Sequence, residues 1–194
     1  LYGSEDIRIE IERTWFEGNA GNQLKTNGPL TLTNSVLIGN CAFFEGQPFT
    51  TMGDFYENGE LVSAVDHCRA TGVALSLGLR AGEKAILVNN TFTGEGDCLI
   101  VPECHPEGGC NELGVITLRN NLFQGQPDYI TAGERVCLFY PVDFDVDPFD
   151  SQALAVASVK DDDCPGSGAL CMADLGLVSS RLDAFDPHLL PNSP

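Results

Sequence analysis

The feature of the sequence that most constrains its fold is an eight-residue segment that occurs four times. The copies are IERTWFEG at residues 11–18, LTNSVLIG at 32–39, LVNNTFTG at 87–94 and LRNNLFQG at 118–125. Each copy starts with a large apolar residue, has another at its sixth position and ends in glycine. Such self-similarity is typical of architectures built from stacked repeats. It predicts that equivalent residues lie above one another in successive coils.

Apolar and polar residues alternate immediately before these segments and at their starts. The alternating apolar positions are Ile7, Ile9 and Ile11, then Leu30 and Leu32, and then Ile116 and Leu118. A period of two is the signature of a β-strand with one buried face. Because such short strands cannot bury that face alone, we expect the copies to stack about 4.8 Å apart around a shared core.

The third position of the segment is asparagine in three copies, at Asn34, Asn89 and Asn120. Asparagine tolerates the unusual backbone angles of a turn, so we expect the strand to bend there. Stacked asparagine amides can also hydrogen-bond from one coil to the next inside a dry interior. The large apolar residue three positions later, for example Phe92, is expected to point back into the core. The final glycine permits a tight exit.

The spacing of the copies leaves two alternatives open. The final glycines, at positions 18, 39, 94 and 125, are 21, 55 and 31 residues apart. The longest separation either hides a further coil with a strand at residues 72–77, or carries an excursion through residues 45–71. An antiparallel β-sandwich with asparagine-rich turns would also give short alternating strands. A sandwich gives no reason for one Asn/Phe/Gly frame to recur, so the sequence favours a coil.

A resemblance makes this prediction more specific. Residues 27–40 (NGPLTLTNSVLIGN) resemble the repeat of the pectin-lyase-like superfamily of parallel β-helices, particularly the coils of bacterial secreted proteins. Residues 173–194 resemble the segment that closes many of these helices, although family versions read on past Ser-Pro into an Ala-Ile-Asp-x-Gly sequence. The resemblance implies an all-β, right-handed parallel β-helix with long disulfide-stapled loops and a secreted, extracellular or cell-surface location. It implies no activity.

The organisation expected from these features is one domain over residues 1–194. Residues 1–140 would form the coils, with loop excursions at residues 45–71 and 95–113, and residues 141–194 an acidic loop and the closing segment. The hydrophobic content of 43% suffices for one continuous core. The missing initial Met and the end at Asn-Ser-Pro predict a piece of a longer chain. No long apolar run is present, so no membrane insertion is expected.

The charge of the chain argues against two classes of partner. The sequence has 28 acidic and 10 basic side chains, and its formal net charge is −18. This charge repels phosphate backbones and anionic headgroups. Nucleic acid and anionic membrane surfaces are therefore poor candidate partners.

The sequence contains eight cysteines: Cys41, Cys68, Cys98, Cys104, Cys110, Cys137, Cys164 and Cys171. The even count and the absence of paired Cys-x-x-Cys motifs favour disulfides over zinc, and hence an oxidising compartment. Reduced core cysteines, and a metal site around His105, are the alternatives. Local loops 104–110 and 164–171 are expected to close on themselves. Pairing 41 with 68 and 98 with 137 is one hypothesis among several, since eight cysteines allow 105 connectivities.

One acidic run is a candidate metal site. Its carboxylates, at Asp143, Asp145, Asp147 and Asp150, alternate along an expected extended segment. Calcium takes six to eight oxygen ligands at about 2.3–2.6 Å, so a dense carboxylate run could bind it. The run matches no EF-hand loop, and a solvated acidic loop is the alternative. Calcium is the only cofactor hypothesised from the sequence.

Two enzymatic chemistries occur in the resembled superfamily. A uronate lyase needs a basic residue to abstract a proton, and Arg119 is the best candidate because alternation places it outward, beside acidic residues expected on neighbouring coils. A salt-bridged surface arginine is the alternative. A glycoside hydrolase needs two carboxylates about 5–10 Å apart. His67, His105 and His188 lie in contexts that do not match the pectinase set.

The sequence as a whole favours a non-enzymatic binding or structural module that acts in adhesion or assembly. We expect its loops to contact a glycan or an extracellular protein, and its open ends to allow self-association. Trp15 could stack on a sugar ring, with packing in the core as the alternative. A carbohydrate-active enzyme, a lyase rather than a hydrolase, is the alternative function. A basic residue that faces carboxylates on the outward strand face would favour the enzyme.

Overall fold

The computed structural model of the chain describes residues 2–3, 7–19, 21–45, 56–57, 60–61, 63, 65, 68, 73–96, 98–103, 114–125, 137–139, 149–152, 154–157, 169–172 and 175–193. These residues form β-strands, together with two 3-10 helices, η1 (Cys41–Phe44) and η3 (Leu182–Ala184), and helical backbone at Val65 and Cys68. The prediction of an all-β architecture is confirmed.

Three parallel sheets account for most of the strands. Sheet A consists of β1 (Tyr2–Gly3), β4 (Leu24–Thr26), β9 (Val73–Gly78), β12 (Cys98–Glu103) and β15 (Cys137–Phe139). Sheet B consists of β2 (Ile9–Glu12), β5 (Leu30–Thr33), β10 (Lys84–Val88), β13 (Val115–Arg119) and β16 (Phe149–Gln152). Sheet C consists of β3 (Trp15–Glu17), β6 (Val36–Gly39), β11 (Thr91–Gly94), β14 (Leu122–Gly125), β17 (Leu154–Ala157) and β18 (Ala169–Met172).

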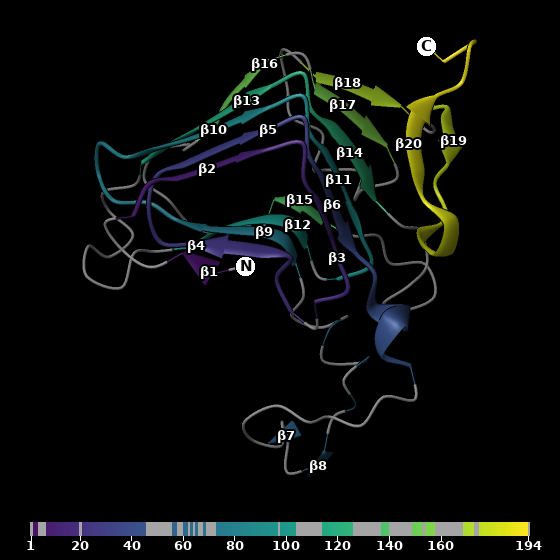
Figure 1. Cartoon of the computed structure of the whole chain (residues 1–194), viewed down its shortest axis with the longest axis horizontal. Coiled ribbons are helices and arrows are strands. Elements are labelled where there is room, and N and C mark those ends of the chain that lie inside the picture. Colours follow the sequence, from purple (N-terminus) through teal and green to yellow (C-terminus); the bar gives the residue numbers. More distant parts are fainter. Residues whose placement is uncertain are drawn as a thin grey trace.

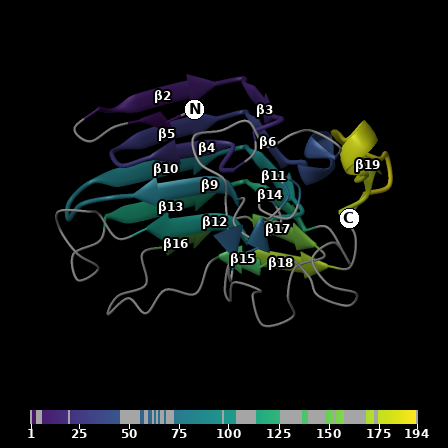
Figure 2. The ribbon, with the colours of Figure 1, turned by 90° about the horizontal axis from the view of Figure 1, so that it is seen from below.

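From β1 to β17, the strands of these three sheets follow one another in a fixed order, and β18 then follows β17 within sheet C. The chain runs from B to C to A and begins again one layer further along, as in β5, β6 and β9, and then β10, β11 and β12. The three sheets enclose one interior (Figure 1), and successive turns lie in layers from the purple N-terminal strands to the green ones (Figure 2). This path is compatible with a β-helix or solenoid. The parallel pairing in all three sheets rules out the antiparallel sandwich for the described strands.

The repeated segments form the corner between sheets B and C. The register aligns Leu32 with Leu87 and Leu87 with Leu118, so the first positions stack as predicted. Because β6 pairs directly with β11, the 55-residue separation is a single turn with an excursion rather than two turns. The expected strand near residues 72–77 is present as β9, and it belongs to sheet A of that same turn.

The core lies where the three sheets face one another. Leu37, Phe92 and Phe123 are all fully buried, which confirms the prediction for the sixth position. The rings of Phe92 and Phe123 stack, with centroids 5.0 Å apart and an interplanar angle of 9°. Aromatic stacking of this kind adds about 0.5–1.5 kcal/mol to the gain from burial.

Two of the final glycines, Gly39 and Gly94, serve close packing of the layers, whereas Gly18 has a φ angle of 79°, as expected for a tight exit. A Cβ atom on Gly39 would lie 3.3 Å from the Cα of Gly94, and one on Gly94 would lie 3.2 Å from the Cα of Gly39. Neither residue has a positive φ angle. A side chain at this column would push neighbouring turns apart.

The sequence predicts that one asparagine position both makes the bend and forms the buried amide bonds, but in the structure two adjacent positions share these roles. Asn34, Asn89 and Asn120 adopt left-handed backbone conformations, with φ angles of 52°, 56° and 53°, which confirms the predicted bend. Their side chains are exposed, and the bond from Asn89 Nδ2 to Asn34 Oδ1 (3.3 Å) lies at the surface. The prediction that these amides stack in a dry interior is therefore wrong, because the left-handed bend turns them toward solvent.

The buried amides belong to the next residue along the chain. Asn90 Oδ1 accepts a hydrogen bond from the backbone N–H of Ser35 at 2.9 Å, and Asn90 Nδ2 donates to the carbonyl of Leu32 at 2.8 Å. Asn121 repeats the arrangement one turn later, with bonds to Asn90 N and to the carbonyl of Leu87. This inner ladder supplies partners to backbone groups that the corner removes from the sheets.

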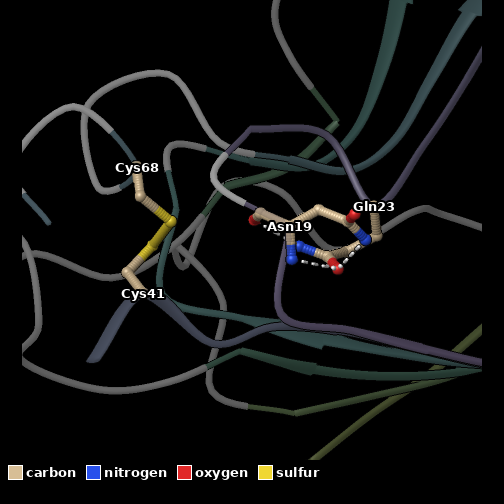
Figure 3. Close-up of a disulfide and its surroundings, with 4 residues drawn as sticks. All are labelled: Asn19, Gln23, Cys41 and Cys68. Atoms are coloured by element: carbon tan, nitrogen blue, oxygen red, sulfur yellow. Dashed lines mark hydrogen bonds between the residues drawn. A yellow bond between two sulfur atoms is a disulfide. The ribbon is translucent and has the colours of Figure 1, made fainter. Parts of the chain in front are cut away.

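One predicted disulfide is confirmed. Cys41 and Cys68 are bonded, with their Cα atoms 5.5 Å apart, close to the buried Gln23, which hydrogen-bonds Asn19 (Figure 3). The bridge joins the segment that follows β6 in sheet C to a residue within the excursion at 45–71. Cys98 is also disulfide-bonded, and its backbone is aligned with that of Cys137 in sheet A.

The C-terminal segment lies along the flank of sheet C. It forms η3 and an antiparallel hairpin of β19 (Leu177–Ser179) and β20 (Asp186–Leu189), drawn in yellow in Figure 1. Leu175 and Leu177 form a small apolar cluster with Leu122 and Phe185. Leu122 is on the outer face of the sheet, since its neighbour Phe123 is in the core. A second short hairpin is formed by β7 (Tyr56–Glu57) and β8 (Glu60–Leu61).

Candidate functional site

The outer face of sheet B is the first surface to test, because it decides between the two expected function classes. Thr31, Ile86 and Thr117 lie side by side on it, each partly buried, and Asp150 is aligned with Thr117 one strand further on. Most positions in this row are short or uncharged.

Arg119 lies on the same face, as predicted. Its direct neighbours in register are Val88 and Gln152, and Asp150 on the next strand is aligned with Thr117, two positions before Arg119. Its Nη1 donates to the carbonyl of Leu118 at 2.9 Å. The structure therefore places an uncharged residue on each side of the candidate base.

The N-terminal end of the stack, formed by β2 and β3, is a second candidate surface. These strands are the last members of sheets B and C among the described residues. Ile9, Ile11 and Phe16 pack against the core but remain partly exposed, and Ile7 has 52% of its surface exposed. The core is thus covered less completely here than in the turns that follow.

The backbone of β2 also offers hydrogen-bonding groups at this end. The N–H of Ile9 donates to the carbonyl of Pro29, and that of Arg13 donates to the carbonyl of Thr33. Residues of a parallel strand bond alternately to one side and the other. The peptide groups of Glu10 and Glu12 therefore point away from β5, toward an edge that no strand of the described residues covers.

The charges of β2 and its flanking residues, Arg8 and Arg13, balance. Arg8 Nε lies 3.3 Å from Glu10 Oε1, and Arg13 Nε lies 3.3 Å from Glu12 Oε1. Exposed pairs of this kind contribute little stability, about 0–1 kcal/mol. They do leave the strand electrically neutral in a protein with a net charge of −18.

A third surface, the Trp15 corner, comprises Trp15, Glu17, Asn40, Leu182 and Phe185. The indole of Trp15 is 49% exposed on the outer face of β3, and Phe185 lies beside it with ring centroids 6.4 Å apart. Trp15 Nε1 donates to Glu17 Oε2 at 3.1 Å. Asn40 Nδ2 donates to Glu17 Oε1 at 3.3 Å and to the carbonyl of Leu182 at 3.4 Å.

Asn40 is the part of this corner that sequence reasoning missed. The residue is 9% exposed, and its Oδ1 atom is buried without a hydrogen-bond partner among the described residues. A buried acceptor without a partner costs about 1–3 kcal/mol. Only its place directly after the repeat glycine distinguished this residue in the sequence.

Asp186 and His188 form an exposed pair on the hairpin. The backbone N–H of His188 and its imidazole both hydrogen-bond Asp186 Oδ1, and these bonds lower the pKa of the Asp186 carboxyl. Because the pair is exposed, it resembles the local bonding of a turn more than a catalytic arrangement.

The remaining predicted site residues fall mostly outside the described part of the chain. This is true of Asp143, Asp145 and Asp147, and of Cys104, Cys110, Cys164, His67 and His105. Asp150 lies in β16, and Cys171 in β18. Within the described residues, no group of three or more His, Cys, Asp or Glu side chains could hold a metal ion.

Comparison of the chain with protein-family models, curated proteins and solved structures finds no match. The search for membrane-spanning helices, which covered the described residues, likewise finds none.

Proposed function

We propose that the chain is a right-handed parallel β-helix of the pectin-lyase-like type that acts outside the cell as a non-enzymatic binding and structural module. The three parallel sheets, the fixed path between them and the inner asparagine ladder support the fold. Crossovers between parallel strands are right-handed in nearly all proteins, which supports the handedness. The disulfide Cys41–Cys68 supports an oxidising compartment.

The observation that carries the proposed function is the N-terminal end of the stack. It combines partly exposed core residues, such as Ile11, with a strand whose peptide groups at Glu10 and Glu12 face outward. An edge that is unpaired among the described residues is a template for a further strand. We propose that a second copy of the chain adds to this edge, so that the module assembles through its ends.

Electrostatics support this choice of surface. Two molecules of charge −18 repel one another, and the repulsion is smallest where each presents a neutral face. The paired charges of Arg8 with Glu10 and of Arg13 with Glu12 make β2 such a face.

Sedimentation velocity over a concentration series tests the proposal. The native chain is expected to associate as its concentration rises. Glu10→Pro removes an outward N–H without breaking the bonds to β5, and Ile11→Lys places a charge in the exposed part of the core. Both variants are expected to shift association to higher concentration by about tenfold or more. Thr117→Lys, on the outer face of sheet B, is the control and is expected to associate as the native chain does.

Three results would contradict the proposal. The first is a native chain that stays monomeric across the series, and the second is association that Glu10→Pro and Ile11→Lys leave unchanged. The third is release of unsaturated products from polyuronates that is lost in Arg119→Ala, which would establish the lyase alternative.

A further inference from the structure

The Trp15 corner has a composition suited to a small ligand, and its ring faces outward from sheet C, on β3 at the N-terminal end of the stack. Trp15 and Glu17 are two residues apart on β3, so both face outward while Phe16 between them packs against the core. Asn40 follows β6, the neighbouring strand, and its amide reaches Glu17. The two strands thus bring a ring, a carboxylate and an amide to one place.

The hydrogen bonds of Glu17 hold this arrangement in position. One carboxylate oxygen accepts from the indole of Trp15 and the other from the amide of Asn40. The ring is therefore oriented by its own polar atom, while nearly half of its surface stays in contact with solvent. A large aromatic ring that is fixed and exposed loses little conformational entropy when a ligand packs on it.

The chemistry of the corner indicates the class of ligand. A pyranose ring presents C–H groups on its faces, which pack on an indole, and hydroxyl groups at its edge, which donate to carboxylate and amide oxygens. Glu17 is exposed beside the ring, and its carboxylate oxygens can accept from such hydroxyl groups, while the amide of Asn40 holds the carboxylate in place.

The charge of the corner narrows the class further. The polar side chains at the ring are a carboxylate and an amide, and the whole chain carries −18. The negative charge of the Glu17 carboxylate and the negative net charge of the chain would both repel a uronate or a sulfated sugar. We propose that the Trp15 corner is a subsite for an uncharged sugar residue of a glycan. The inference rests on the proposed function, because it names a ligand for the binding module.

Fluorescence offers a site-specific test, because Trp15 is the only tryptophan in the chain. The full chain is titrated with cellohexaose, xylohexaose and mannohexaose as neutral probes, and with oligogalacturonate as the anionic probe. At least one neutral probe is expected to change the Trp15 emission with a Kd of about 1 mM, an affinity within reach of a site that holds one ring. Oligogalacturonate is expected to leave the emission unchanged.

Calorimetry on variants completes the test. Trp15→Ala is expected to weaken binding of the responding probe by about tenfold or more, and Trp15→Phe by less, because it keeps an aromatic ring. Val115→Ala removes a comparably exposed apolar side chain from sheet B, and it is expected to bind as the native chain does. Thermal melts of all variants show whether each is folded.

The outcomes separate this inference from the proposed function. Binding of a neutral probe that is lost in Trp15→Ala supports the subsite. Binding that the substitution leaves unchanged, preference for oligogalacturonate, or no response to any neutral probe overturns it. In each of these cases the association experiment still decides the proposed assembly, since Trp15 is not among the residues changed there.

Discussion

Asn89 and Asn90 are adjacent in the chain and have opposite environments. Asn89 is exposed in a left-handed bend, whereas Asn90 is 1% exposed and bonds to the turns on both sides. The residue that forms the amide ladder therefore directly follows the residue that adopts the left-handed bend. Two adjacent asparagines of the same chemical type perform two different tasks.

This contrast gives a matched pair of substitutions. Asn90→Leu keeps the volume but leaves the N–H of Ser35 and the carbonyl of Leu32 without their side-chain partner. We expect it to lower the free energy of unfolding by about 2–4 kcal/mol. Asn89→Gly suits the positive φ angle and should change stability by less than about 0.5 kcal/mol. Urea unfolding followed by circular dichroism measures both, and equal effects would contradict the ladder.

Sequence reasoning could locate the bend but not the ladder. Asn34, Asn89 and Asn120 recur at one position of the repeat, so their column was visible. The ladder column contains Ser35, Asn90 and Asn121, and its side-chain directions follow only from the positive φ angles of the preceding residues. Arg13, which has a φ angle of 53° in the first turn, carried no signal at all, because arginine rarely adopts this conformation.

At the scale of elements, the C-terminal hairpin shows how a segment without a repeat is held. Leu177 is 7% exposed within the cluster under the hairpin, whereas its neighbour Val178 is 51% exposed. The N–H of Leu190 donates to the carbonyl of Gly176 at 2.7 Å, at the start of the same segment. Docking of the hairpin therefore rests on its inward-facing side chains.

Substitutions at these neighbours test that docking. Leu177→Ala should increase opening of the hairpin, with amide exchange at Leu190 faster by about tenfold or more, because a buried leucine contributes more than 1.4 kcal/mol. Val178→Ala removes an exposed side chain and should leave that exchange unchanged. Hydrogen exchange measured by NMR compares the two, and similar rates in both variants would refute this account of the hairpin.

The position of this segment was not predictable from its residues. Its resemblance to a closing segment predicted a structural role, but the run from Leu175 to Ser193 has no periodic pattern to say which surface it covers. The contacts that place it, Trp15 with Phe185 and Asn40 with Leu182, span most of the chain length. Contacts between residues so far apart in the sequence cannot be predicted from local sequence patterns.

At the scale of the whole molecule, the stacked path was predictable because each turn repeats the same alternation. Leu32, Leu87 and Leu118 mark successive layers, and the register aligns them. The residues that recur in each turn form the interior, whereas the candidate binding surfaces consist of residues that do not recur. Their function therefore depends on where the stack brings them, as at the neutral, partly uncovered end formed by β2.

Amide hydrogen exchange at β2, measured by NMR at several protein concentrations, tests assembly through this end most directly. The account predicts that exchange at Glu10 and Glu12 slows as concentration rises, because their outward N–H groups become paired with another copy. Exchange at Leu190, whose N–H is bonded within the chain, should stay constant. Exchange at Glu10 and Glu12 that is independent of concentration would contradict it.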